Sequence, residues 1–270
     1  IINGSGTQNI YIGSSGSKSI YNLTINKTTG STVNVQTSNI NILNNLWVQS
    51  GTFSLNGLSG NVGGDLTVTS SNGSIAQSGT FNMIATSGPR IIQLNGSNLN
   101  NVTINATGVT YTAQDNISIY GNFTLTAGTF DGNGKYVNLG NTGGRTISVA
   151  AGAVYKVGSA GTLALGNTAA VTINGTIEVI GSVSSIATIT KTATGGSYNF
   201  DVNGTIKAQY YLLEYMTAAG ISINSTATID PTYNLSDGTF TNGPTNCKYL
   251  TISNTQTLTI NNVIFPFTPA

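Results

Sequence analysis

Apolar–polar–apolar triplets recur along the whole chain. A period of two residues predicts short strands with one face buried and the other in water. Clusters of Gly, Asn and Ser separate the triplets and supply turns. The pattern therefore predicts an all-β, repetitive and extended protein. The triplets lie at 23–25, 40–42, 46–48, 53–55, 66–68, 102–104, 117–119, 123–125, 147–149, 171–173, 177–179, 221–223, 250–252 and 258–260.

Short sequence repeats indicate the spacing of these strands. INGTIEV at 173–179 matches VNGTIKA at 202–208, and INSTATI follows at 223–229. These segments begin 29 and 21 residues apart. A spacing of 21 to 29 residues, with two or three short strands in each repeat, is typical of one coil of a β-solenoid. The other repeats are QSGTF at 49–53 and 77–81, AGTF at 127–130, DGTF at 237–240, and a longer match of 20–55 with 99–130.

The predicted fold class is all-β, a right-handed parallel β-helix (β-solenoid) of roughly ten coils of 21–29 residues. A β-sandwich or barrel is the alternative for a series of short strands, but these folds rarely repeat near-identical turns at coil spacing. Because hydrogen-bonded strands lie about 4.8 Å apart, ten coils would form a rod on the order of 50 Å long.

The match of INGTIEV with VNGTIKA also predicts which side chains lie next to each other. It places Glu178 beside Lys207 on the outer face, where they can form an exposed ion pair. It stacks Asn174 on Asn203, so that the two amides can begin a hydrogen-bonded ladder. The glycine after each asparagine is expected to provide a turn with positive φ.

The whole chain, 1–270, is expected to form a single solenoid domain, either complete or as a segment of a longer polypeptide. Residues 208–270 read as less regular C-terminal coils. Within them, AQYYLLEYM at 208–216 is a short helix, a cap or a wide coil, and the flanking strand patterns favour the coil. Pro266 and Pro269 either end the last strand and protect its edge or precede further coils.

Composition and charge exclude several functional classes. Hydrophobic residues make up 39% of the chain and charged residues only 6%, with nine Lys/Arg against eight Asp/Glu. No basic cluster suits nucleic acid, and no apolar run is long enough for membrane insertion. The chain contains no His and one Cys, which removes catalytic triads and most metal sites, so no cofactor or metal is expected.

The carboxylates do not form an enzyme site in the sequence. Glycoside hydrolysis needs two carboxyl groups about 5–10 Å apart, and polysaccharide lyases need a calcium site beside a base. The closest pair, Asp230 and Asp237, adjoins Pro231 and Gly238 and suits turns better. A polysaccharide-degrading β-helix enzyme therefore remains only as a further alternative. The acids are Asp65, Asp115, Asp131, Glu178, Asp201, Glu214, Asp230 and Asp237.

Several segments resemble the repeats of long secreted bacterial surface proteins that fold as right-handed parallel β-helices. They are YNLTINKTTG at 21–30, GTFSLNG at 51–57, GNFTLTAGTFDGNG at 121–134, and stretches between 208 and 265. Autotransporter passengers and filamentous-haemagglutinin-like adhesins share this architecture. The resemblance implies an extracellular structural or adhesive role, often as one part of a longer polypeptide. It transfers no catalytic residue.

Trp47 is the residue predicted to contact a partner. Leu46 and Val48 should face inward by alternation, so Trp47 should face outward, where tryptophan often serves as an interface or sugar-stacking residue. The alternative is that it packs on Tyr21. The tyrosines Tyr210, Tyr211 and Tyr215 are expected in the core of a wide coil. Cys247 is expected to be a small buried filler or a surface thiol that crosslinks subunits.

Asn-X-Ser/Thr triplets are frequent, and they are potential N-glycan acceptors in a host that has the machinery. A chain this rich in Asn, Ser and Thr also contains many such triplets by chance. The acceptor asparagines singled out are Asn22, Asn72, Asn95, Asn122, Asn174 and Asn203.

Together these features predict a non-catalytic, extracellular structural or adhesive protein, a subunit or segment of a cell-surface filament, fibre or layer. Its expected partners are further copies or adjacent segments of the same assembly, and glycans. The main alternative is a monomeric carbohydrate-binding adhesin module. Ice binding through Thr-X-Thr pairs is disfavoured because the four pairs, at 67–69, 124–126, 188–190 and 257–259, are irregularly spaced.

Overall fold

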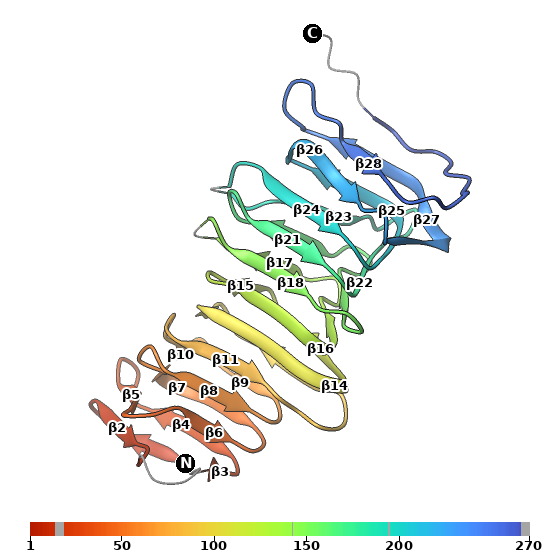
Figure 1. The fold of residues 1–270 in the computed structure, drawn as a ribbon. Coiled ribbons are helices and arrows are strands. Elements are labelled where there is room, and N and C mark those ends of the chain that lie inside the picture. Colours follow the sequence, from red (N-terminus) through yellow and green to blue (C-terminus); the bar gives the residue numbers. More distant parts are fainter. Residues whose placement is uncertain (14–18, 142, 194, 266–270) are drawn as a thin grey trace.

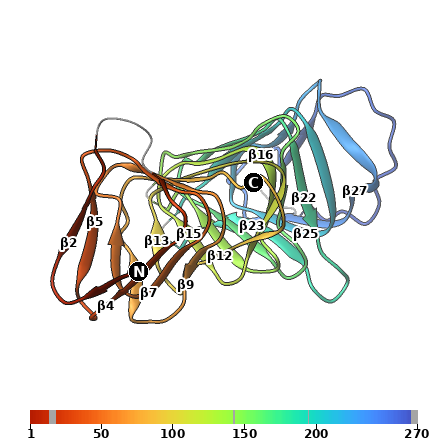
Figure 2. The ribbon, with the colours of Figure 1, turned by 90° about the horizontal axis from the view of Figure 1, so that it is seen from below.

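The protein is a β-solenoid of about ten turns, seen in a computed structural model that describes residues 1–13, 19–141, 143–193 and 195–265. The strands in these ranges join into one 28-stranded sheet, which is wound into stacked coils (Figure 1). Turned by 90°, the coils still follow one another in chain order (Figure 2). No helix in the described ranges is long and apolar enough to cross a membrane. The predicted stack of parallel coils is confirmed.

The strands form three parallel ladders that run along the rod. Ladder A contains β3 (Ser19–Ile20), β6 (Ile40–Ile42), β8 (Ser59–Val62), β11 (Thr80–Met83), β18 (Thr146–Val149), β21 (Ala170–Ile173), β24 (Tyr198–Val202), β26 (Met216–Ile223) and β28 (Leu250–Ile252). Ladder B contains β1 (Ile2–Gly4), β4 (Leu23–Lys27), β9 (Leu66–Val68), β12 (Arg90–Gln93), β19 (Val154–Lys156) and β22 (Thr176–Ile180). Ladder C contains β2 (Gln8–Tyr11), β5 (Thr32–Gln36), β10 (Gly73–Ile75), β13 (Asn98–Leu99), β15 (Ile117–Ile119), β17 (Tyr136–Leu139), β20 (Thr162–Leu165) and β23 (Ala187–Lys191). Ladder C is interrupted between β10 and β13, where the Ile75 N–H donates to the Ser97 side-chain oxygen.

Five long strands bend around a corner and serve two ladders each. β14 (Asn101–Ala113) and β16 (Phe123–Asp131) pass from ladder A to ladder B. β7 (Leu46–Ser54), β25 (Thr205–Glu214) and β27 (Thr228–Thr241) pass from ladder B to ladder C. Chain order therefore runs A, B, C around each coil.

The interior is one continuous apolar column along the axis of the rod. Within each triplet the two apolar side chains point inward, as Ile25, Val48 and Val68 do on ladder B. Aromatic residues fill the wider coils. Phe123, Phe130 and Tyr155 form a mutual cluster with ring centroids 5.3–5.9 Å apart. Because each coil covers the side chains of the next, even very short strands bury their apolar face.

The coil lengths agree closely with the sequence prediction. On ladder A, a short coil leads from Ile40 to its partner Gly60, and a long one leads from Val171 to Phe200. The predicted match of 20–55 with 99–130, however, does not reflect the register. Leu23 lies on ladder B and pairs with Leu46, whereas Val102 lies on ladder A. The triplets look alike on all ladders, so their resemblance does not identify the ladder.

The Gly-Thr-Phe repeats are corner motifs that occur at different corners. Gly51 turns the chain from ladder B into ladder C with φ of 80°, and Gly128 turns it from ladder A into ladder B with φ of 88°. Gly79 precedes a strand of ladder A. The phenylalanine that follows the corner is buried in each case. The repeated segments thus share the local structure of a corner, but they do not occupy the same position in each coil.

The neighbours predicted from the match of 173–179 with 202–208 are confirmed. Glu178 pairs with Lys207 in the ladder, and their charged atoms lie 3.2 Å apart. The Asn203 side chain donates to Oδ1 of Asn174 at 2.9 Å, and Asn224 in turn donates to Oδ1 of Asn203 at 2.7 Å. These asparagines form the expected ladder of amides.

The prediction of a turn with positive φ at the glycine after each of these asparagines is wrong. Neither Gly175 nor Gly204 has positive φ. A Cβ on Gly204 would instead collide with the backbone carbonyl oxygens of Gly175 and Asn174 in the preceding coil. Glycine is required here because two backbones approach closely, and not because the chain needs a left-handed conformation.

The C-terminal region contains strands and an irregular final coil. AQYYLLEYM, left open between helix, cap and coil, belongs mainly to strand β25. In the last coil the Gln256 side chain donates to the Ile229 carbonyl at 3.0 Å and accepts from the Ile229 N–H at 2.6 Å. This amide replaces the peptide group of a further strand and closes ladder B. Pro266 and Pro269 lie outside the described residues.

Candidate functional surfaces

Trp47 lies on the outward side of ladder B, as predicted, and is half-buried. Its neighbours in register are Thr24 and Thr67, which are only 8% and 7% exposed although they also face outward. Their burial is expected if the indole lies across them. No ring contact joins Trp47 to Tyr21 among the described residues, where Tyr21 is exposed. The indole therefore offers a partly accessible apolar surface among threonines.

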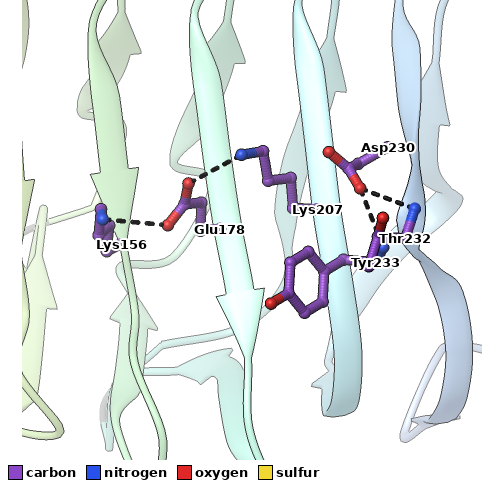
Figure 3. Close-up of polar contacts among 6 residues, drawn as sticks. All are labelled: Lys156, Glu178, Lys207, Asp230, Thr232 and Tyr233. Carbon is purple, nitrogen blue, oxygen red and sulfur yellow. Dashed lines mark hydrogen bonds and ion pairs between the residues drawn. The ribbon is translucent and has the colours of Figure 1, made fainter.

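A column of alternating charge follows the outer side of ladder B over five successive coils. In order, Asp131, Lys156, Glu178 and Lys207 are register partners, and Asp230 comes next, directly after the Ile229 partner of Ile206 at a point where the register shifts. Glu178 lies between the two lysines, 3.4 Å from Nζ of Lys156 and 3.2 Å from Nζ of Lys207 (Figure 3). Asp230 accepts the backbone N–H groups of Thr232 and Tyr233 and so also shapes a turn. We name these five residues the charge column.

Next to the charge column runs a column of threonines. Thr129 pairs with Val154, which pairs with Thr176, and Thr205 and Thr228 continue the row. β-Branched side chains suit such exposed ladder positions because their χ1 freedom is already restricted. This face of the rod thus combines hydroxyl and methyl groups with charges of both signs.

Replacing Glu178 by Gln is expected to destabilise the fold by less than about 1 kcal/mol, because both of its ion pairs are partly exposed. Denaturant unfolding at low salt measures this loss, and added salt should reduce it. Asp201→Asn is the matched control, since it removes the same charge from a residue that belongs to no ion pair within the described ranges. A loss several times larger than this, specific to Glu178→Gln and insensitive to salt, would contradict the expectation.

The remaining carboxylates mostly accept hydrogen bonds from a neighbouring coil. Asp65 accepts the N–H of Ile91 at 3.0 Å, and Asp115 accepts the N–H of Leu94 at 2.9 Å. Asp237 accepts from the side chains of Gln209 and Asn262, and these hydrogen bonds lower the pKa of its carboxyl group. No group of three or more potential metal ligands occurs in the part of the chain that the structure describes.

The three tyrosines predicted for the core occupy different environments. Tyr211 is buried and its hydroxyl donates to the Leu235 carbonyl at 2.8 Å, and burial raises the pKa of this hydroxyl. Tyr215 is half-buried, and the ammonium of Lys191 lies 4.4 Å from its ring centroid. Tyr210 is half-buried as well. Only Tyr211 is therefore a core residue.

Several of the asparagines predicted as glycan acceptors have a structural role. Asn22 accepts the backbone N–H of Asn45, and Asn122 accepts that of Thr146, each one coil further on. The amides of Asn174 and Asn203 belong to the asparagine ladder. Asn72 and Asn95 lie exposed at turns. Attachment of a glycan at these two sites would leave the ladder hydrogen bonds intact.

Cys247 is half-buried and not fully buried, and it has no disulfide partner in the described ranges. Its Sγ lies 3.3 Å from the Thr217 carbonyl oxygen.

The Thr-X-Thr pairs are spread over the molecule as expected, with Thr67 on ladder B, Thr124 on ladder A and Thr188 on ladder C. They therefore do not form one array.

Comparisons with protein-family models, with curated proteins and with solved structures reveal no significant match to this chain.

Proposed function

We propose that this protein is a non-catalytic, extracellular structural or adhesive component, acting as a subunit or segment of a cell-surface filament, fibre or layer. The continuous stack of parallel coils supports this most directly. Hydrogen-bonded ladders that run the length of a rod resist bending and stretching, because deformation must break many backbone bonds together. The resemblance to secreted bacterial surface repeats agrees with the same role.

The chemistry of the surface supports the proposal as well. Charged residues are few, and outward positions of ladder A carry mainly Asn, Ser and Thr, among them Asn61, Asn82, Thr103 and Ser148. Such a surface stays hydrated without a strong electrostatic field. Assembly through it should therefore depend little on moderate salt.

Electron microscopy of the native, undisrupted source material tests this function. We expect regular filaments, fibres or sheets that contain the protein and persist in moderate salt. Antibody labelling identifies the chain within them, and material from cells lacking the gene is the control. Labelled single short rods with no assembly would contradict the structural role.

A second function, a monomeric carbohydrate-binding module, is favoured by the accessible indole of Trp47. Indole rings stack on sugar faces, and the threonine neighbours could add hydrogen bonds. Saturable binding to a defined glycan, lost in Trp47→Ala and retained in the control Tyr21→Ala, would support it. Binding that is the same in both variants would rule out Trp47 as the platform.

A further inference from the structure

A polar pocket opens in the central part of the rod, at the corner where ladder B turns into ladder C. Its volume is about 290 Å³. Residues 95–98, which lead into β13, form one wall, and Asp115, Asn116 and Ser118 of the next coil form the other. The strands β15 and β17, which follow on ladder C, lie in the central coils (Figure 1). The pocket therefore belongs to two neighbouring coils inside the stack.

Asp115 is fixed at the boundary between these two coils. Its carboxylate accepts the backbone N–H of Leu94 at 2.9 Å and also that of Asn95. A carboxylate has about four lone-pair sites, so two N–H donors leave room for hydrogen bonds from a ligand. Because the backbone already orients this group, binding does not have to order it.

The side chains around the carboxylate have unused hydrogen-bonding groups. Within the described ranges, the amides of Asn95 and Asn98 and the hydroxyl of Ser118 have no hydrogen-bond partner. Oδ1 of Asn116 accepts the backbone N–H of Tyr136 at 3.0 Å, which holds the amide in place and leaves its two N–H donors available. The pocket thus offers fixed donors beside a fixed acceptor.

The ring of Tyr136 adjoins this pocket on the next coil. Ile117 pairs with Val137, so the preceding residues Asn116 and Tyr136 are neighbours on the outward face of ladder C. Tyr136 is 38% exposed. Its partner on the following coil is Thr162, a smaller side chain. An accessible aromatic surface therefore lies one strand away from the polar wall.

The chemistry of this surface suits a sugar better than other ligands. Asp115 is the one charged residue among those that line the pocket in the described part of the chain, so an anion would be repelled. A single carboxylate is also too few for a Ca²⁺ site. Sugar hydroxyl groups can donate to the carboxylate and accept from the amides, while the C–H face of a sugar ring packs on an aromatic ring.

We propose that this pocket binds a neutral oligosaccharide, with one sugar unit hydrogen-bonded to Asp115 and Asn116 and the next unit stacked on Tyr136. Neighbouring strands lie about 4.8 Å apart, which is comparable to the length of one pyranose unit in a chain that follows the rod. The site does not include Trp47. This inference rests on the adhesive part of the proposed function and specifies the ligand class and the residues that hold it.

Two variants of Tyr136 test the stacking contact. Tyr136→Ala removes an exposed ring, so the fold should be retained, but the affinity for the oligosaccharide should fall by about tenfold. Tyr136→Phe keeps the ring and should bind within about twofold of the wild type. Tyr21→Ala is the matched control, because it removes an exposed tyrosine ring that lies away from the pocket.

Asn116→Asp tests the polar contact. The substitution keeps an oxygen that can accept the Tyr136 N–H and removes the two amide donors that face the ligand, so binding should again weaken by about tenfold. Asn39→Asp is the matched control. The Asn39 side chain is also exposed, and its Oδ1 accepts the Ser59 N–H of the next coil at 2.9 Å. Both substitutions therefore add the same charge at the same kind of hydrogen bond.

Isothermal titration calorimetry on the full chain measures the affinities. The probes are cellohexaose, xylohexaose, mannohexaose and maltohexaose, with hexagalacturonate as the acidic contrast. A host without N-glycosylation keeps Asn95, a potential acceptor, free of an attached sugar. We expect saturable binding of at least one neutral probe, stronger by about tenfold than binding of its monosaccharide. Circular dichroism confirms that each variant folds.

Several outcomes would overturn the site. They are no binding of any neutral probe, binding that is equal in the wild type, Tyr136→Ala and Asn116→Asp, and a preference for hexagalacturonate. Binding lost only in Trp47→Ala would place the sugar on the indole instead. Native filaments without sugar binding would leave the structural role intact, whereas failure of the proposed function is seen separately, as native material that contains only single rods.

Discussion

Gly204→Ala should destabilise the solenoid by about 3 kcal/mol or more, at the upper end of what overpacking costs. The new Cβ would meet backbone oxygens of Gly175 and Asn174, and neither can move freely. The Gly204 N–H donates to Ile173 at 2.9 Å, and the Thr205 N–H donates to Gly175 at 2.7 Å. Relief of the collision must therefore lengthen these hydrogen bonds between the two neighbouring coils.

Gly13→Ala is the matched control for this prediction. Gly13 has no positive φ, and no atom of the described residues would lie within 4 Å of its Cβ. There the substitution should be neutral or stabilise by up to about 1 kcal/mol, because alanine reduces the conformational entropy of the unfolded chain. Denaturant unfolding measures both variants. Equal effects at the two positions would show that the close backbone approach at Gly204 is not a constraint.

Phe123→Ala should cost about 3–5 kcal/mol, the usual range for a large aromatic in a packed core. Phe123 is fully buried, and its ring lies 5.5 Å from Phe130 and 5.9 Å from Tyr155. The cavity would lie in the middle of the rod. Since each coil contacts only its neighbours, a weak central coil should also uncouple the two halves, so that they unfold at different denaturant concentrations.

Hydrogen exchange followed by mass spectrometry separates these effects. Protection should fall most in the coils around Phe123 and remain near the wild-type level at distant coils. Tyr136→Ala serves as the control, because Tyr136 is an exposed aromatic on ladder C of the same region. A uniform loss of protection along the chain would instead mean that the rod unfolds as one unit.

The sequence was sufficient to predict the strands, the coil length and one stretch of register. Alternation reveals each short strand because one of its faces is always buried. Near-identical segments around Glu178 and Lys207 then align two coils without ambiguity. Elsewhere the register could not be predicted, because all three ladders use the same triplet chemistry. Leu23 and Val102 look equivalent in sequence and lie on different ladders.

The candidate surfaces were predicted less completely, for a related reason. Alternation alone directs Trp47 outward, but its threonine neighbours follow only from the register of the first coils. The charge column was found only in part, because Asp131, Lys156 and Glu178 are separated by unequal numbers of residues. No feature of the sequence indicated that Gln256 closes ladder B, because a single glutamine in a chain rich in polar residues does not stand out.

The charge column has a consequence for how such a protein can change its length in evolution. Its signs alternate from coil to coil, from Asp131 to Asp230. Deleting the single coil that carries Glu178 would bring Lys156 next to Lys207, and like charges directly opposite each other destabilise a sheet. Deleting two neighbouring coils would restore alternation. Within this region, recombination should therefore insert or delete coils in pairs. Related proteins of different length should then differ by an even number of coils here.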